Sequence, residues 1–126
     1  RLPLREPVAL PCPGLVLLVE DNPDLRTQLR EMLTGLGHAV AEASSVAEAC
    51  ALADGLDVDL VLSDITLEGA EPGTDLPARL PGLPVRLMTA LPEAHPLYRR
   101  AAAMGPVLRK PFSAGALAAF LSEDPA

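Results

Sequence analysis

The chain of 126 residues is long enough for one domain that buries a core without disulfides or a structural metal. Apolar residues make up 49% of it but aromatic residues only 2%, so aliphatic side chains have to fill the core, which is typical of α/β packing. The formal net charge of −7 opposes the attraction to phosphate backbones that nucleic-acid binders use, so we expect no direct contact with nucleic acid.

The N-terminal segment is rich in proline. Residues 1–13 contain four prolines, a density that prevents a regular helix. We therefore predict a linker, or the tail of a preceding domain, at 1–13 and a single folded domain at 14–126.

A strand, a helix and a second strand are predicted next. Residues 15–19 are an unbroken apolar run, which predicts a strand buried on both faces. An Asp-Asn-Pro turn follows and supplies a cap and a proline suited to the start of a helix. Apolar residues then recur at helical spacing over 24–36, before Gly37, so an amphipathic helix is predicted there. Weaker alternation over 38–43 predicts an outer strand.

The rest of the chain continues the alternation of strands and helices. A helix capped by Ser44 or Ser45 and ended by Asp54-Gly55 is predicted first, followed by a strand at 59–63 and a loop at 65–73. A short helix then opens at Thr74 or Asp75 and stops at Pro81-Gly82, and a strand follows at 85–88. The last predicted elements are a late-starting helix that ends at Met104, a strand at 107–109 and a helix capped by Ser113. In the fourth helix, Leu97, Ala101 and Met104 are expected to face the sheet. Five alternations in so short a chain imply a parallel sheet covered by helices on both sides.

Polar residues stand where four of the predicted strands end. They are Glu20 with Asp21, then Asp64, Thr89 and Lys110. In a parallel sheet these strand ends share one edge, so the side chains are expected to converge there.

Three carboxylates that lie together repel one another unless a cation is present. Mg²⁺ prefers one or two carboxylates together with waters, a carbonyl and phosphate oxygens. Glu20, Asp21 and Asp64 are therefore predicted to bind Mg²⁺, with the backbone carbonyl of Thr66 as an additional ligand.

A carboxylate can also attack phosphorus to give an aspartyl phosphate, a transfer that depends mostly on positioning and charge neutralisation. Lys110 supplies a compact positive charge for the phosphoryl oxygens, and the Thr89 hydroxyl supplies a hydrogen-bond donor. A cis bond before Pro111 is one way to hold the lysine loop.

Four segments resemble, in order and spacing, the motifs of one family: the receiver domains of two-component response regulators and hybrid sensor histidine kinases. The segments are Leu-Val-Glu-Asp-Asn-Pro at 18–23, Leu-Ser-Asp-Ile at 62–65, Thr-Ala at 89–90 and Leu-Arg-Lys-Pro-Phe at 108–112. The resemblance covers Gly14 to about Leu121. It implies a flavodoxin-like (βα)5 three-layer sandwich whose parallel five-stranded sheet has the order 2-1-3-4-5.

The resemblance also assigns roles. It implies Asp64 as phosphoacceptor, Glu20 and Asp21 as metal acids, Thr89 as switch hydroxyl and Lys110 as the site lysine. The partner is then a histidine kinase or a histidine phosphotransfer domain that donates the phosphoryl group from phosphohistidine. The phosphorylated domain is expected to repack the face of its fourth helix, fifth strand and fifth helix, which is also the expected surface for a dimer. Such a domain is not an enzyme, although it assists its own phosphorylation and dephosphorylation, and the parent chain is a candidate histidine kinase.

The chain departs from the family's pattern at two places. The position three residues before the lysine, often aromatic in the family, is Val107, so coupling by rotation of a ring is not expected there. The loop after Asp64 lacks the usual Met-Pro and carries Glu68 and Glu71, a form that is similar to receivers attached to hybrid kinases. Residues 1–4 are similar to the closing strand of a kinase ATP-binding domain, in keeping with that placement.

Other interpretations remain open. Taken singly, Glu20-Asp21 is typical of a solvated turn and Asp64 of a helix cap. One alternative function is a phosphorylation-independent docking domain with the same fold. Another is a hydrolase of the haloacid dehalogenase type, which expects an acid two residues after the nucleophile, where this chain has Thr66.

Cysteine usage and hydropathy bear on location. Cys12 and Cys50 lack metal-ligand spacing, and Cys50 is predicted to be a buried, reduced thiol. No apolar run approaches the roughly 18 to 20 residues that span a bilayer, so no membrane contact by this domain is expected. The first residues lack the hydrophobic stretch of a signal peptide. A reducing cytosol, and therefore a cytoplasmic location, is the expectation.

Overall fold

A five-stranded parallel sheet forms the centre of the protein in the computed structural model, which describes residues 14–67 and 71–122. The strands are β1 Leu15–Val19, β2 Ala39–Ala43, β3 Leu60–Asp64, β4 Val85–Thr89 and β5 Val107–Arg109. The helices are α1 Pro23–Gly35, α2 Val46–Gly55, α3 Leu76–Arg79, α4 Pro96–Met104 and α5 Ala114–Ser122, with a 3₁₀ turn, η1, at Gly73–Asp75. The strand order is β2-β1-β3-β4-β5, which confirms the predicted flavodoxin-like fold.

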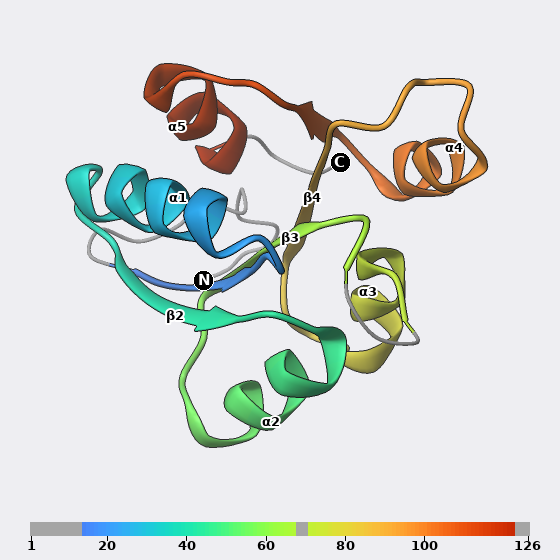
Figure 1. Cartoon of the computed structure of the whole chain (residues 1–126). Coiled ribbons are helices and arrows are strands. Elements are labelled where there is room, and N and C mark those ends of the chain that lie inside the picture. The colour runs from blue at the N-terminus through green and yellow to red at the C-terminus, as the bar shows by residue number, and fades with distance from the viewer. Residues whose placement is uncertain (1–13, 68–70, 123–126) are drawn as a thin grey trace, which may run out of the picture.

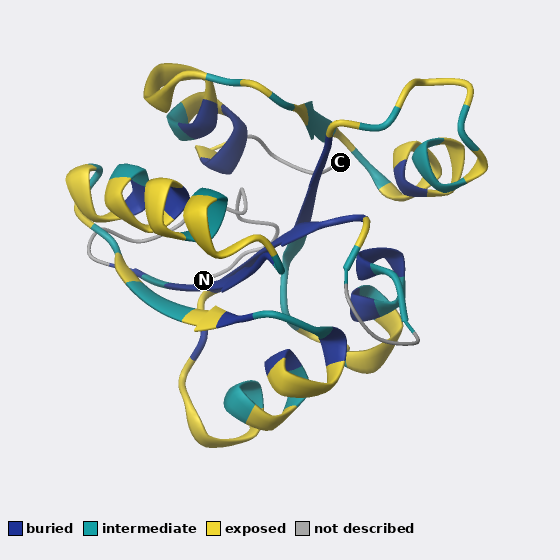
Figure 2. Cartoon of the chain, in the orientation of Figure 1, coloured by how far each residue is buried: buried dark blue, intermediate teal, exposed yellow. Residues whose placement is uncertain are grey.

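The helices cover both faces of the sheet. Helices α1 and α5 lie on one face, and α2, α3 and α4 lie on the other (Figure 1). The central strand β3 is buried along its whole length, and β1 is buried except at its first residue (Figure 2), as expected for strands that are covered on both sides. Alternate residues of β1 therefore enter two separate clusters: Val16 packs toward α1 and α5, and Leu17 packs toward α2 and α3.

Side-chain caps mark the beginnings of α1, α2 and α5. The carboxamide oxygen of Asn22 accepts hydrogen bonds from the backbone N–H groups of Asp24 and Leu25, so α1 begins at Pro23, one residue before the predicted start. The hydroxyl of Ser45 accepts from Glu48 N–H at the start of α2, and that of Ser113 accepts from Ala116 N–H near the start of α5, as predicted.

The structure corrects two packing predictions. Met104 is 47% exposed, so the prediction that it faces the sheet is wrong, although Ala101, one turn earlier, is buried. Met104 is the last residue of α4 and lines an open surface cavity of about 120 Å³ instead. Cys50 is only half-buried, because it lines another surface cavity between α2 and the residues that follow α3.

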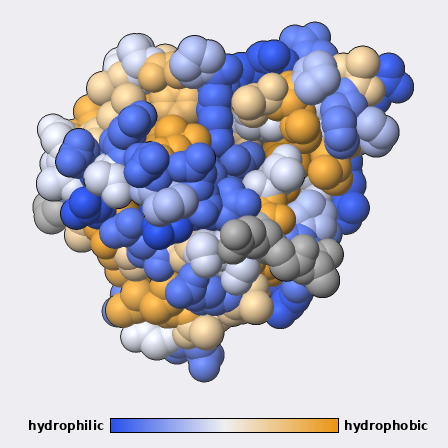
Figure 3. Space-filling model, in the orientation of Figure 1, coloured by the Kyte–Doolittle hydropathy of each residue, from blue (hydrophilic) through white to orange (hydrophobic). Residues whose placement is uncertain are grey.

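Several sequence predictions fall outside the described residues. They concern the 1–13 segment with Cys12, and Glu68 in the loop after β3. Within the described parts of the chain, no helix is both long and apolar enough to cross a bilayer. On the face shown in Figure 3, hydrophobic residues form separate patches among hydrophilic ones.

Candidate functional site

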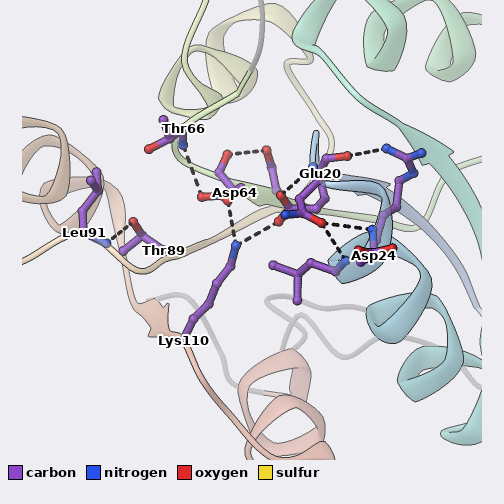
Figure 4. Close-up of polar contacts among 11 residues, drawn as sticks. Glu20, Asp24, Asp64, Thr66, Thr89, Leu91 and Lys110 are labelled. Carbon is purple, nitrogen blue, oxygen red and sulfur yellow. Dashed lines mark hydrogen bonds and ion pairs between the residues drawn. The ribbon is translucent and has the colours of Figure 1, made fainter.

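Asp64 is the last residue of β3 and lies at the carboxyl edge of the sheet. Its side chain is largely buried, with 12% of its surface exposed. One carboxylate oxygen, Oδ2, is 2.7 Å from Nζ of Lys110, and the other, Oδ1, accepts a hydrogen bond of 3.2 Å from Thr66 N–H (Figure 4). The carboxylate is therefore held at both oxygens by groups from two different loops.

The acidic turn after β1 brings a second carboxylate to the same place. Backbone N–H of Glu20 donates to the carbonyl oxygen of Ala43, which extends the pairing of β1 with β2 to the edge of the sheet. The buried side chain of Glu20 accepts from Asn22 N–H through Oε2 at 3.2 Å and from Lys110 Nζ through Oε1 at 2.9 Å. Its carboxylate is thereby turned toward Asp64 (Figure 4).

Three acids could hold a metal ion here. Glu20, Asp21 and Asp64 each offer a carboxylate oxygen, and the three oxygens lie within 4.8 Å of one another. Hard oxygen donors at this density suit a small divalent cation such as Mg²⁺, so the donor set fits the predicted ion. For Thr66, the structure gives the N–H contact to Asp64, and its carbonyl as a ligand stays a prediction.

Lys110 follows β5 and bridges the two buried acids. Its backbone N–H donates to the carbonyl oxygen of Thr89, and the peptide bond between Lys110 and Pro111 is cis, as the sequence suggested. Burial opposes the charged ammonium, but the hydrogen bonds to Asp64 and Glu20 outweigh this effect and raise the pKa of Lys110. The lysine is therefore a fixed positive charge between two carboxylates.

Burial also opposes the charged form of Glu20, and here it is not outweighed. Burial and, less strongly, repulsion by Asp64 raise the pKa of Glu20, and the hydrogen bond from Lys110 lowers it in part, so the resulting pKa is about 7. A carboxylate with a raised pKa is short of compensating positive charge, which a divalent cation would supply.

Thr89 is the fully buried last residue of β4 and lies at the same edge of the sheet. Its hydroxyl oxygen accepts a hydrogen bond of 2.9 Å from Leu91 N–H in the loop that leads to α4 (Figure 4). The structure thus brings Glu20, Asp64 and Lys110 into direct contact. It connects Thr89 by a hydrogen bond to the loop between β4 and α4.

Sequence reasoning missed the role of Gly73. Its N–H donates to the carbonyl oxygen of Ile65, and its Cα lies so close to β3 that a Cβ would be 2.0 Å from the carbonyl oxygen of Asp64. The hydroxyl of Ser63 donates to that same carbonyl. Glycine is needed here because two backbone segments approach each other closely. In the sequence, Gly73 is one of several loop glycines, and nothing marks it out from the others.

The family model for the response regulator receiver domain matches residues 16–122. The chain belongs to this family. The receiver domain is also 38% identical over 82 residues to the transcriptional regulatory protein GlrR of Escherichia coli K12, and equally to QseF of Escherichia coli O157:H7. These matches span 62% of this chain but only 18% of either relative.

Solved structures of receiver domains have the same fold. The receiver domain of a modulated diguanylate cyclase from Desulfovibrio desulfuricans is 32% identical, with a TM-score of 0.77 over 86% of this chain and 90% of that one. The receiver domain of a sensor histidine kinase from Pseudomonas aeruginosa, described with a magnesium ion coordinated in its active-site cleft, is 25% identical, with a TM-score of 0.75 over 87% and 95%. Family membership leaves the hydrolase alternative without support.

Proposed function

We propose that this receiver domain takes a phosphoryl group onto Asp64 from the phosphohistidine of a histidine kinase or histidine phosphotransfer domain. The observation that carries the proposal is the bridge formed by Lys110, whose ammonium contacts the carboxylates of both Asp64 and Glu20. A cation in contact with the acceptor carboxylate is suitably placed to neutralise the charge of an incoming phosphoryl group.

The transfer exchanges one bond to phosphorus for another. A carboxylate oxygen of Asp64 attacks phosphorus, the phosphorus–nitrogen bond of phosphohistidine breaks, and the imidazole leaves with the electron pair and takes up a proton. Lys110 stays beside the acylphosphate oxygens, while the hydroxyl of Thr89 donates a hydrogen bond to the new group. Receiver domains are not classical enzymes, and we propose that this one only assists its own phosphorylation and dephosphorylation.

The metal ligands in this proposal are Glu20, Asp21 and Asp64, together with the backbone carbonyl of Thr66. When bound, Mg²⁺ supplies positive charge that offsets the repulsion among the carboxylates and the phosphoryl oxygens. The close spacing of the three carboxylates and the raised pKa of Glu20 support this assignment.

Phosphorylation is proposed to act as a conformational switch. The new dianion attracts the hydroxyl of Thr89, which pulls on the loop that contains Leu91. The face formed by α4, β5 and α5 repacks in response, and the same face is our candidate surface for a dimer.

The placement of the domain in a longer protein is also part of the proposal. We propose that residues 1–13 are a linker or the tail of a preceding domain, that 14–126 form the receiver, and that the parent is a cytoplasmic protein, with a hybrid histidine kinase as the candidate. The family model matches residues 16–122, which lie within the proposed receiver.

Formation of an aspartyl phosphate tests the function. With Mg²⁺ present, acetyl phosphate should add one phosphoryl group by intact mass, and beryllofluoride should bind with the same Mg²⁺ requirement. Asp64→Ala should abolish both, whereas Asp57→Ala, a change at an exposed acid before β3, should not. Persistence of the adduct in Asp64→Ala would refute the proposal. A wild-type chain that binds no Mg²⁺ at millimolar concentration would instead be the phosphorylation-independent docking domain.

A further inference from the structure

Arg26 connects the acidic turn of the site to the neighbouring strand. Its Nη1 donates a hydrogen bond of 2.8 Å to the backbone carbonyl oxygen of Glu20, and its Nε is 3.3 Å from Oε1 of Glu42 on β2. With 24% of its side chain exposed, Arg26 is more buried than Arg30, the other arginine that contacts Glu42. One planar side chain thus holds the end of β1 and a residue of β2 at the same time.

The carbonyl that Arg26 contacts belongs to the residue whose carboxylate contacts Lys110. This carbonyl is part of the peptide bond between Glu20 and Asp21, so rotation of that bond would move both acids of the turn. From this geometry we propose that Arg26 is a positioning residue for the metal-binding turn. The inference rests on the proposed function in one respect, since it takes Glu20 and Asp21 as metal ligands.

A role of Arg26 through its charge and a role through positioning predict opposite effects of its removal on Mg²⁺ binding. A cation near a metal site opposes the binding of Mg²⁺, so an arginine that acted only by its charge would weaken binding, and its removal would strengthen it. The guanidinium of Arg26 is compensated by Glu42 and is partly open to solvent, both of which reduce its long-range effect. Partners that orient metal ligands have a larger effect, since their loss typically weakens metal binding by about 10- to 100-fold.

Arg30 provides the matched control. Its Nε is 3.4 Å from Oε2 of Glu42, so Arg26→Gln and Arg30→Gln each remove one positive charge from the same carboxylate. Only Arg26 has a hydrogen bond to the carbonyl of Glu20 in the described structure. Arg26→Lys keeps the charge, but a single ammonium cannot reproduce the two-point contact of the guanidinium fork.

The experiment is a calorimetric titration of the metal-free domain with Mg²⁺ at constant ionic strength, with thermal unfolding of each variant as a check of folding. Arg26→Gln should raise the Kd by about 10-fold, and Arg26→Lys should restore little of this, whereas Arg30→Gln should stay within about two-fold of wild type. Equal effects of Arg26→Gln and Arg30→Gln, or tighter binding by Arg26→Gln, would overturn the proposal.

Amide resonances of the metal-free variants give a readout that does not depend on Mg²⁺. The resonances of Glu20 and Asp21 should shift or broaden in Arg26→Gln and stay in place in Arg30→Gln. If the wild-type domain bound no Mg²⁺, the proposed function would fail, and these resonances alone would then decide whether Arg26 positions the turn. Unchanged resonances in Arg26→Gln would overturn it.

Discussion

The Nζ atom of Lys110 lies 2.7 Å from Oδ2 of Asp64, although 46 positions separate the two residues in the sequence. Both side chains are largely buried, with 13% and 12% of their surfaces exposed. The same ammonium is 2.9 Å from Oε1 of Glu20, so a single cation compensates two carboxylates at the edge of the sheet.

Removal of this cation should destabilise the metal-free domain. Lys110→Met leaves two buried carboxylates without their shared donor, and we expect the free energy of unfolding to fall by about 1–3 kcal/mol in urea denaturation. Mg²⁺ should restore much of the loss, because the proposed metal site uses the same carboxylates. Arg100→Met is the control, since its ion pair with Asp75 is exposed and such pairs contribute only about 0–1 kcal/mol. Equal losses in the two variants would contradict this prediction.

The stability of the metal-free domain should also depend on pH through Glu20. Burial raises the pKa of Glu20 from 4.5 to about 7 in the folded protein, whereas the unfolded chain keeps the ordinary value. Between these two values the folded state binds more protons than the unfolded state, so the free energy of unfolding falls as the pH rises from 4.5 to 7 and levels off above that.

Denaturation curves at several pH values in the absence of Mg²⁺ measure this decline. Glu20→Gln cannot ionise at this position, so its free energy of unfolding should fall less over the same pH range. A decline of equal slope in wild type and Glu20→Gln would assign the pH dependence to other groups.

The contact among Glu20, Asp64 and Lys110 could be predicted from the sequence because it depends on topology. Each residue follows an apolar strand, and parallel strands bring their carboxyl ends to one edge whatever the details of packing. Topology determines only that these residues lie at the same edge of the sheet. The roles assigned to them remain predictions that the adduct experiments test.

Features that depend on the placement of neighbouring elements could not be predicted. Helical periodicity identified the inward side of α4 but not that its last residue, Met104, borders an open surface cavity. The glycines of the loop after β3 look alike in sequence, and only the folded chain shows that Gly73 touches the backbone of Asp64. The contact of Arg26 with Glu42 crosses from α1 to β2 and has no local sequence signal.

Gly73→Ala should disturb the site directly. The added methyl group would lie 2.0 Å from the carbonyl oxygen of Asp64 and 2.8 Å from Oγ of Ser63, so the loop or the end of β3 has to move. We expect a loss of about 1–3 kcal/mol in the free energy of unfolding, as for other overpacked sites, and slower adduct formation with acetyl phosphate.

Gly35→Ala is the control for Gly73→Ala. Apart from its chain neighbours and the backbone of its own helix, no atom lies within 4 Å of a Cβ at Gly35 in α1. Alanine there should stabilise the domain by about 0.4–1 kcal/mol by restricting the unfolded chain. Adduct formation at the wild-type rate in a folded Gly73→Ala variant would show that Asp64 tolerates the displacement.

Arg109 should couple the site to α4 in the absence of an aromatic residue at position 107. Its Nη1 donates to the carbonyl oxygen of Leu91 at 3.3 Å, and its guanidinium carbon is 5.5 Å from the ring centroid of Tyr98 on α4. Leu91 N–H also donates to the hydroxyl of Thr89. A displacement of Thr89 therefore reaches Tyr98 through the backbone of Leu91 and the side chain of Arg109.

Tyr98 supplies its own readout, because the chain has one tyrosine and no tryptophan. Beryllofluoride with Mg²⁺ should change tyrosine fluorescence in the wild type, since the guanidinium moves relative to the ring. In Arg109→Met the adduct should still form by mass or fluorine NMR while the fluorescence change is largely lost. Arg99→Met, which removes an exposed arginine from the same helix, should keep the change. A full fluorescence response in Arg109→Met would show that α4 senses the site by another route.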